Sequence, residues 1–148
     1  MQFWFRYVYK NYTKIEIGAV KSILSDFYSS FKSHQGFIFE ELVRKMLLKK
    51  ILENNILKCA SRSIVNYWDK HNEFDIYSED KDYLLIGEIK LNNKAINAKL
   101  IKKINDFSKF KQKNIIKIVI TFNPINSQPI INLLKQNNFH FFSFKDLL

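Results

Sequence analysis

The sequence has few of the residues that cross-link a chain or interrupt its regular structure: one cysteine, two prolines and three glycines in 148 residues. A single cysteine, Cys59, excludes an internal disulfide framework and suits a reducing cytosol. Because glycine and proline are the residues that most often end helices and strands, their scarcity predicts that most of the chain lies in regular elements. The histidines and the cysteine also lack the spacing that a zinc site needs.

Long apolar runs are absent as well. No run reaches the roughly 18 residues needed to cross a bilayer, and the N-terminus lacks the uninterrupted apolar region and the small-residue cleavage site of a signal peptide. We therefore expect a cytoplasmic protein without a membrane partner. The length fits one domain over residues 1–148. Within it we expect a helical N-terminal extension, residues 1–33, packed on a core of residues 36–148.

Charge is unevenly distributed along the chain, whose formal net charge is +10. Residues 89–148 contain eleven lysines against two acids, which gives +9, whereas the residues before them are nearly balanced at +1. A basic half that follows a small acidic cluster favours a nucleic-acid enzyme, with lysines for phosphates and carboxylates for a metal. The alternative is a general bias toward lysine and asparagine that has no function.

Hydrophobic spacing predicts an α/β fold with a mixed central β-sheet flanked by α-helices. Apolar residues recur with helical spacing over Ile15–Phe31 and, after a break at Ser33–Gly36, over Phe37–Glu53. The β-branched run at 114–122 predicts a buried, parallel strand. The other expected elements are a short helix at 2–9, strands at 63–68, 72–77 and 83–90, helices at 96–111 and 126–137, and a strand at 139–144.

The hairpin formed by 72–77 and 83–90 gathers charged residues. If side chains alternate between faces, Glu73, Asp75 and Tyr77 share one face, and Glu88 and Lys90 share one face of the next strand. Two carboxylates and an ammonium group then converge near the open end of the hairpin. Hard divalent cations prefer carboxylate oxygens, and a lysine can orient water, so this arrangement suits a Mg²⁺-dependent phosphodiesterase.

The helix at Phe37–Glu53 contributes one more acid. At 100° per residue, Phe39, Leu42, Val43, Met46 and Leu47 share a face, and Glu40 lies at the flank of that face. We therefore expect the Glu40 side chain to point toward the sheet. The alternative is that Glu40 is an exposed carboxylate in the first turn of a helix, where the helix dipole stabilises it. Glu73 is either an auxiliary acid or a structural residue. We expect Gly36 in a turn before this helix and Gly87 at a close approach of the backbone.

The order of these elements, with Glu40 on the first helix, Asp75 on the second strand and Glu88-x-Lys90 on the third, resembles the PD-(D/E)XK nuclease superfamily. A closer resemblance is to the domain of unknown function at the C-terminal end of archaeal-type ATPases. Five short motifs in order carry it: an FWFRYVY opening, Ile15–Gly18, Gly36–Glu40, Glu73–Asp75 after Tyr67-Trp68, and Gly87–Lys90. The resemblance implies a restriction-endonuclease-like core. It also implies, as a partner, an ATPase module or a winged-helix module in a separate chain.

The resemblance further implies roles for particular residues. Asp75, Glu88 and the backbone carbonyl of Ile89 would hold Mg²⁺ or Mn²⁺, Lys90 would hold the attacking water, and Glu40 would contact the metal through water or steer the lysine. The implied activity is DNA endonuclease cleavage of phosphodiester bonds, with a homodimer as a plausible assembly. The alternative is an inactive nucleic-acid-binding or regulatory domain. Candidates for phosphate contacts, against a merely solvated helix face, are Lys94, Lys99, Lys102 and Lys103.

Overall fold

The computed structural model describes residues 4–53, 56, 57, 59 and 61–148, and these fall into two compact units, Met1–Phe39 and Glu40–Leu148. The predicted arrangement, one domain with an extension at 1–33 and a core at 36–148, stays a prediction, because the two units are not placed relative to one another. Across the described residues, no helix combines the length and the apolar character that a membrane span requires.

The first unit begins with short helical turns. A π-helix at Trp4–Val8 and a 3₁₀ helix at Tyr9–Asn11 precede helix α1, Tyr12–Glu16. Gly18 follows α1 with a φ of 72°, a left-handed conformation that glycine adopts without steric cost. Tyr7 then packs edge-on against Phe27 of helix α2, with ring centroids 4.9 Å apart.

Helix α2, Val20–Leu52, corrects two of our predictions. It runs without a break through Ser33–Gly36, where the sequence suggested two separate helices, and Gly36 lies inside it rather than in a turn. A glycine inside a helix costs only about 1 kcal/mol relative to alanine. Because no proline lies nearby, that cost does not end the helix. The glycine that does allow a turn is Gly18.

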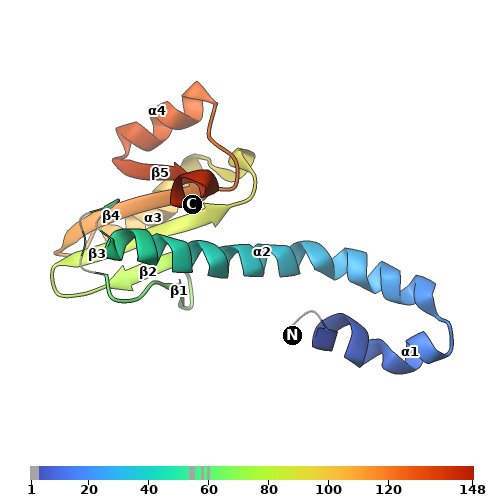
Figure 1. Ribbon diagram of the computed structural model, residues 1–148. Coiled ribbons are helices and arrows are strands. Elements are labelled where there is room, and N and C mark those ends of the chain that lie inside the picture. The colour runs from blue at the N-terminus through green and yellow to red at the C-terminus, as the bar shows by residue number, and fades with distance from the viewer. Residues whose placement is uncertain (1–3, 54–55, 58, 60) are drawn as a thin grey trace. The chain divides into compact units, whose positions relative to one another are not determined.

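The second unit is built on a five-stranded mixed sheet in the order β1-β2-β3-β4-β5 (Figure 1). The first three strands pair antiparallel, and β3, β4 and β5 pair parallel, which confirms both the predicted α/β class and the parallel strand. Their bounds are β1 Val65–Trp68, β2 Glu73–Glu79, β3 Tyr83–Lys90, β4 Asn114–Thr121 and β5 Phe139–Ser143. Helices α3, Ala98–Ser108, and α4, Gln128–Gln136, provide the crossovers, and a 3₁₀ helix at Phe144–Leu147 follows β5.

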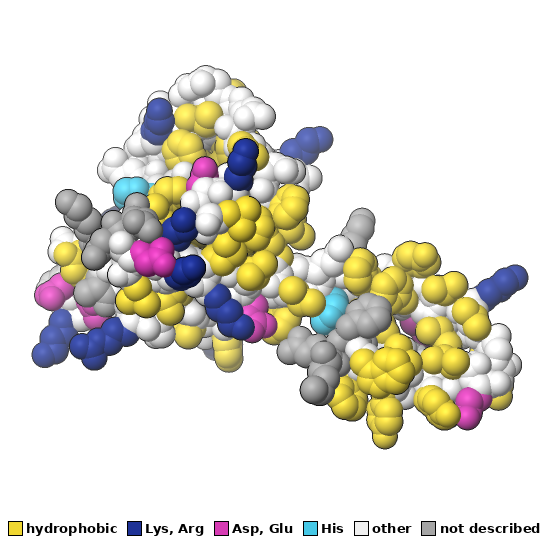
Figure 2. Space-filling model, in the orientation of Figure 1, with side chains coloured by type: hydrophobic (Ala, Val, Ile, Leu, Met, Phe, Trp, Pro, Cys, Tyr) yellow, Lys and Arg dark blue, Asp and Glu magenta, His cyan; other side chains and the backbone are white. Residues whose placement is uncertain are grey.

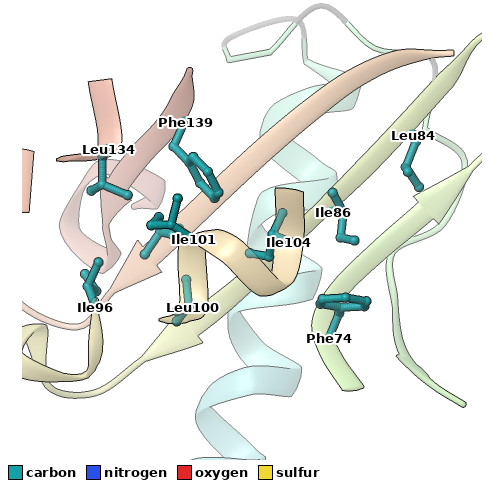
Figure 3. Close-up of a cluster of buried hydrophobic side chains, with 10 residues drawn as sticks. Phe74, Leu84, Ile86, Ile96, Leu100, Ile101, Ile104, Leu134 and Phe139 are labelled. Carbon is teal, nitrogen blue, oxygen red and sulfur yellow. The ribbon is translucent and has the colours of Figure 1, made fainter. Parts of the chain in front are cut away.

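Helix α3 covers one face of the sheet. The Asn97 side chain caps its first turn by accepting a hydrogen bond from the Leu100 N–H at 3.1 Å. Three apolar residues of α3 then enter the core (Figure 3). The cluster consists of Phe74, Leu84, Ile86, Ile96, Leu100, Ile101, Ile104, Val119, Leu134 and Phe139.

The C-terminal part of α2 lies on the opposite face of the sheet from α3 (Figures 1 and 3). Its buried side chains, Val43, Leu47 and Ile51, recur at intervals of four residues. Leu42, which we expected on this buried face, is exposed. The sheet is thus covered by helices on both faces, and the end of β3 lies between them.

Candidate functional site

An irregularity in β2 shapes the charged end of the hairpin. The β1–β2 register passes from Val65↔Tyr77 to Tyr67↔Phe74, so three residues of β2 correspond to two of β1. Phe74 and Tyr77 consequently pack on the same ring, that of Phe107. Our prediction that Glu73, Asp75 and Tyr77 share a face is therefore wrong, because the extra residue breaks the strict alternation. Bulges of this kind often redirect side chains beside functional sites.

Asp75 lies within this irregular stretch and turns its carboxylate toward the end of β3. Its Oδ2 accepts a hydrogen bond from the Ile89 N–H at 2.9 Å and a longer one from the Lys90 Nζ at 3.3 Å. The Asp75 carbonyl accepts from the Arg44 guanidinium on α2 at 3.0 Å. Strand β3 and helix α2 together fix the position of this acid.

Glu88 is the most buried charged residue of the site, with 4% of its surface exposed. Its Oε2 lies 2.6 Å from the Lys90 Nζ, and its Oε1 lies 2.8 Å from the Lys103 Nζ. Burial and the nearby Asp75 raise the pKa of Glu88, against the opposing pull of the two lysines. A buried carboxylate needs partners of this kind, because an isolated buried charge is very costly.

Lys90 connects the two acids, since its Nζ contacts both Asp75 and Glu88. Burial alone would lower the pKa of Lys90, but the charges of Asp75 and Glu88 together raise it above the ordinary value. Lys90 therefore carries a positive charge at neutral pH. It can neutralise an anion or donate a hydrogen bond, but it cannot serve as a general base there.

Glu40 lies near this group, on α2. Burial and the negative charge of Asp75 raise its pKa, while Arg44, whose guanidinium is 3.9 Å from the Glu40 carboxylate, lowers it. The positive charge of Lys90 also lowers the pKa of Glu40. Because α2 begins at Val20, Glu40 lies deep inside the helix, so stabilisation by the dipole of a first turn does not apply to it.

The lysines predicted for phosphate contacts divide into two groups. Lys94, Lys99 and Lys102 are exposed. Lys103 instead turns inward: it pairs with Glu88, donates a hydrogen bond to the Glu73 carbonyl, and lies over the Phe74 ring with its Nζ 4.7 Å from the ring centroid. The assignment of Lys103 to phosphate contacts stays a prediction, and its side chain is 36% exposed.

The interactions of Arg44 and Lys103 at this site were not predicted from the sequence. Arg44 lies four residues after Glu40, a spacing that places two side chains on one helix face and could have drawn attention to it. Lys103 precedes the buried Ile104 and lies four residues before Phe107, so it borders the core face of α3. Neither spacing indicates which partner a long basic side chain selects.

Gly87 precedes Glu88 on β3 and confirms the expected close approach of the backbone. A Cβ atom at this position would overlap the carbonyl oxygen of Ile118 on the neighbouring strand β4. Only glycine allows β3 to lie against β4 in this way. The position of Glu88 thus depends on Gly87 as well as on its own ion pairs.

The oxygen atoms at this end of β3 suit a hard divalent cation. Lys90 already shows that one positive group can contact Asp75 and Glu88 together. The Ile89 N–H points to Asp75, and since the N–H and C=O of a strand residue face the same neighbour, the Ile89 carbonyl faces Asp75 too. Among the residues that the structure describes, no three His, Cys, Asp or Glu side chains are grouped to hold a metal. Mg²⁺ accepts one or two carboxylates with water, so the donor set fits it.

Comparison with protein families gives a match over more than half of the chain. The model of the DUF234 family, described as archaeal and bacterial proteins of unknown function, matches residues 4–104. The chain belongs to this family. The matched DUF234 segment includes Glu40, Asp75, Glu88, Lys90 and Lys103, and it ends before β4. No curated protein and no solved structure matches the chain.

Proposed function

We propose that this DUF234 protein hydrolyses phosphodiester bonds in DNA as a Mg²⁺- or Mn²⁺-dependent endonuclease. The observation that carries the proposal is the convergence of two acids on one ammonium group: the Lys90 Nζ lies 3.3 Å from Asp75 Oδ2 and 2.6 Å from Glu88 Oε2. The resemblance of the element order to PD-(D/E)XK nucleases supports it further. The mixed sheet and the helices on its two faces agree with that order.

Each residue of the site has a role in this proposal. Asp75, Glu88 and the Ile89 carbonyl would hold the cation. When bound, Mg²⁺ would supply Lewis-acid chemistry, polarising the phosphate and lowering the pKa of water. Lys90, held protonated by the two acids, donates a hydrogen bond to the attacking water or neutralises charge on the phosphate. Glu40, whose carboxylate interacts electrostatically with Lys90, would help to orient the lysine.

The DNA surface in this proposal follows directly after β3. Lys94 lies in a 3₁₀ helix, Asn93–Ala95, only a few residues beyond Lys90, and Lys99 and Lys102 lie on α3. All three lysines are exposed. Contacts of lysines with the phosphate backbone supply affinity that falls steeply as salt increases. These lysines therefore belong to binding, whereas Asp75, Glu88 and Lys90 belong to the reaction.

A second candidate function is nucleic-acid binding without cleavage, as a module that serves an ATPase partner. The charge balance of the site favours it, because Lys90 and Lys103 already neutralise Asp75 and Glu88. Such a module keeps the basic surface but gains nothing from a divalent cation. It predicts salt-sensitive binding to DNA that is the same with Mg²⁺ and with a chelator.

The experiment that separates these functions incubates the protein with supercoiled, linear, branched and single-stranded DNA, each with Mg²⁺, Mn²⁺ or a chelator. We expect products only with a divalent cation, and loss of product in Asp75→Asn, Glu88→Gln and Lys90→Met. Glu40→Gln should lower the rate of cleavage, and Glu41→Gln is its control, because Glu41 pairs with Lys45 on the exposed side of α2. Cleavage that survives all three site substitutions would sink the proposal. Binding without cleavage on every substrate would establish the second function instead.

A further inference from the structure

Lys103 is the residue of the site that the proposed reaction leaves without a role. It comes from helix α3, and its Nζ lies 2.8 Å from Glu88 Oε1. The same ammonium group donates to the Glu73 carbonyl and lies 4.7 Å from the centroid of the Phe74 ring. Three different contacts therefore hold a side chain that sequence spacing placed among exposed lysines.

The pairing of Lys103 blocks one oxygen of the buried acid. Each Glu88 oxygen contacts its own ammonium group, Oε2 that of Lys90 and Oε1 that of Lys103. A lone pair remains on each oxygen, but the two ammonium charges repel a metal ion that approaches either one. A cation that binds Asp75 and Glu88 must therefore take the place of one of the two lysines on Glu88.

Lys103 is the lysine that can leave more easily. Lys90 contacts both acids from within strand β3, and 26% of its side chain is exposed. Lys103 contacts only Glu88 among the acids, and 36% of its side chain is exposed. If Lys103 leaves Glu88, the Glu73 carbonyl and the Phe74 ring still offer contacts to its ammonium group.

We propose that Lys103 is a positioning residue that occupies Glu88 Oε1 in the metal-free protein and gives up this oxygen when a divalent cation binds. The inference rests on the proposed function, because it assumes that Asp75 and Glu88 hold the cation. Lys103 keeps the buried carboxylate paired and oriented before the cation arrives. It also weakens cation binding, since the cation must first displace an ammonium group of like charge.

The test measures cation binding rather than activity. Isothermal titration with Mn²⁺ is carried out on the full chain, on Lys103→Met and on Lys103→Gln, which removes the charge but keeps a hydrogen-bond donor. We expect both variants to bind Mn²⁺ at least about tenfold more tightly than the wild type, a change of about 1.4 kcal/mol. Lys103→Arg keeps the charge and should bind as the wild type does. Lys109→Met is the matched control: it removes an exposed lysine from the C-terminal end of the same helix and should leave the affinity for Mn²⁺ unchanged.

The outcomes separate this inference from the proposed function. If the wild type binds Mn²⁺, Glu88→Gln does not, and both neutral Lys103 variants bind no more tightly than the wild type, the inference is overturned while the proposed function stands. If neither the wild type nor any Lys103 variant binds Mn²⁺, both are overturned. Thermal unfolding by circular dichroism shows whether Lys103→Met is folded, and Lys103→Gln replaces it if it is not.

Discussion

The two compact units of this protein differ in what they expose to water. Among the described residues of the first unit, only Tyr7, His34 and Phe39 are buried. Large apolar side chains lie at its surface, over α1 and the N-terminal half of α2 (Figure 2). They are Trp4, Phe5, Tyr9, Tyr12, Ile15, Ile17, Val20, Leu24, Tyr28, Phe37 and Ile38. The second unit instead buries apolar side chains on both faces of its sheet, together with the charged Glu88.

Among the described residues, most of the buried apolar side chains lie in the second unit, and the first unit carries many exposed ones. A carboxylate can be buried only where the surrounding structure supplies partners for it, and among the described residues the buried carboxylate, Glu88, lies in the second unit. Exposed apolar side chains in number are typical of surfaces that contact another protein. The candidate chemistry therefore belongs to the second unit.

The largest expected effect comes from paired substitutions of isoleucine. Ile104→Ala removes a fully buried side chain from the cluster under α3 and should lower the free energy of unfolding by about 2–5 kcal/mol. Ile17→Ala removes a side chain that is 75% exposed in the first unit and should change it by less than about 0.5 kcal/mol. Urea unfolding of both variants measures the difference. Equal losses would show that the first unit buries as much apolar surface as the second.

Replacing a glycine by alanine should change the free energy of unfolding in opposite directions in the two units. Gly87→Ala places a methyl group against the Ile118 carbonyl and should destabilise the protein by about 1–3 kcal/mol. Gly36→Ala has open space around its Cβ and lies inside α2, so it should stabilise by about 0.5–1 kcal/mol. Thermal unfolding provides the measurement. If Gly36→Ala destabilises the protein, α2 is not a continuous helix at that point.

The two acids next to the unit boundary should respond to pH in opposite directions. Burial and Asp75 raise the pKa of Glu40 above 4.5, so the folded state holds its proton more tightly than the unfolded state does. Its contribution to stability is therefore complete below pH 4.5 and is lost as pH rises through the raised pKa. We expect Glu40→Gln to match the wild type at low pH and to exceed its stability at neutral pH.

Glu41 is the control for this pH dependence. Its hydrogen bond with Lys45 lowers its pKa, so its contribution is present above pH 4.5 and is lost as pH falls through the lowered value. Glu41→Gln should therefore be slightly less stable than the wild type at neutral pH. Melting temperatures between pH 3 and pH 8 test both variants. If both substitutions change the melting temperature at neutral pH in the same direction, the effect of Asp75 and burial on Glu40 is contradicted.

The smallest expected effect concerns the surface of the first unit. Tyr28→Ser replaces an aromatic side chain that is 71% exposed and should change the free energy of unfolding by less than about 0.5 kcal/mol. Chemical unfolding at low protein concentration measures it. A loss above about 1 kcal/mol would show that Tyr28 is covered in solution. Sedimentation of the same samples would then show whether a second copy covers it.

Much of the second unit could be predicted from the sequence, because its signals are local. The apolar run at 114–122 marked β4 as a buried parallel strand, and the strands predicted at 72–77 and 83–90 correspond to β2 and β3, although β2 continues to Glu79. The candidate cluster of Asp75, Glu88 and Lys90 followed from the same hairpin. These predictions depend on periodicity within a few residues, which the final packing of the unit preserves.

Other features depend on tertiary structure and could not be predicted in this way. The extra residue in β2 leaves no mark on the hydrophobic pattern, yet it decides that Phe74 and Tyr77 meet the same ring. Helix α2 continues through Gly36 because a glycine inside a helix costs only about 1 kcal/mol relative to alanine, and the helical residues on either side can offset that cost. The partner of Lys103 depends on how α3 lies over β3.

The central claim is that Asp75, Glu88 and Lys90 form a cation-dependent phosphodiesterase site. The most direct test is the rate at which the wild type and Glu88→Gln nick supercoiled DNA, each measured with Mg²⁺ and with a chelator. We expect nicking by the wild type with Mg²⁺ only, and a loss of at least about a hundredfold in Glu88→Gln, which keeps the shape of the side chain but removes its charge. Equal nicking by both proteins, or nicking that persists in the chelator, would contradict it.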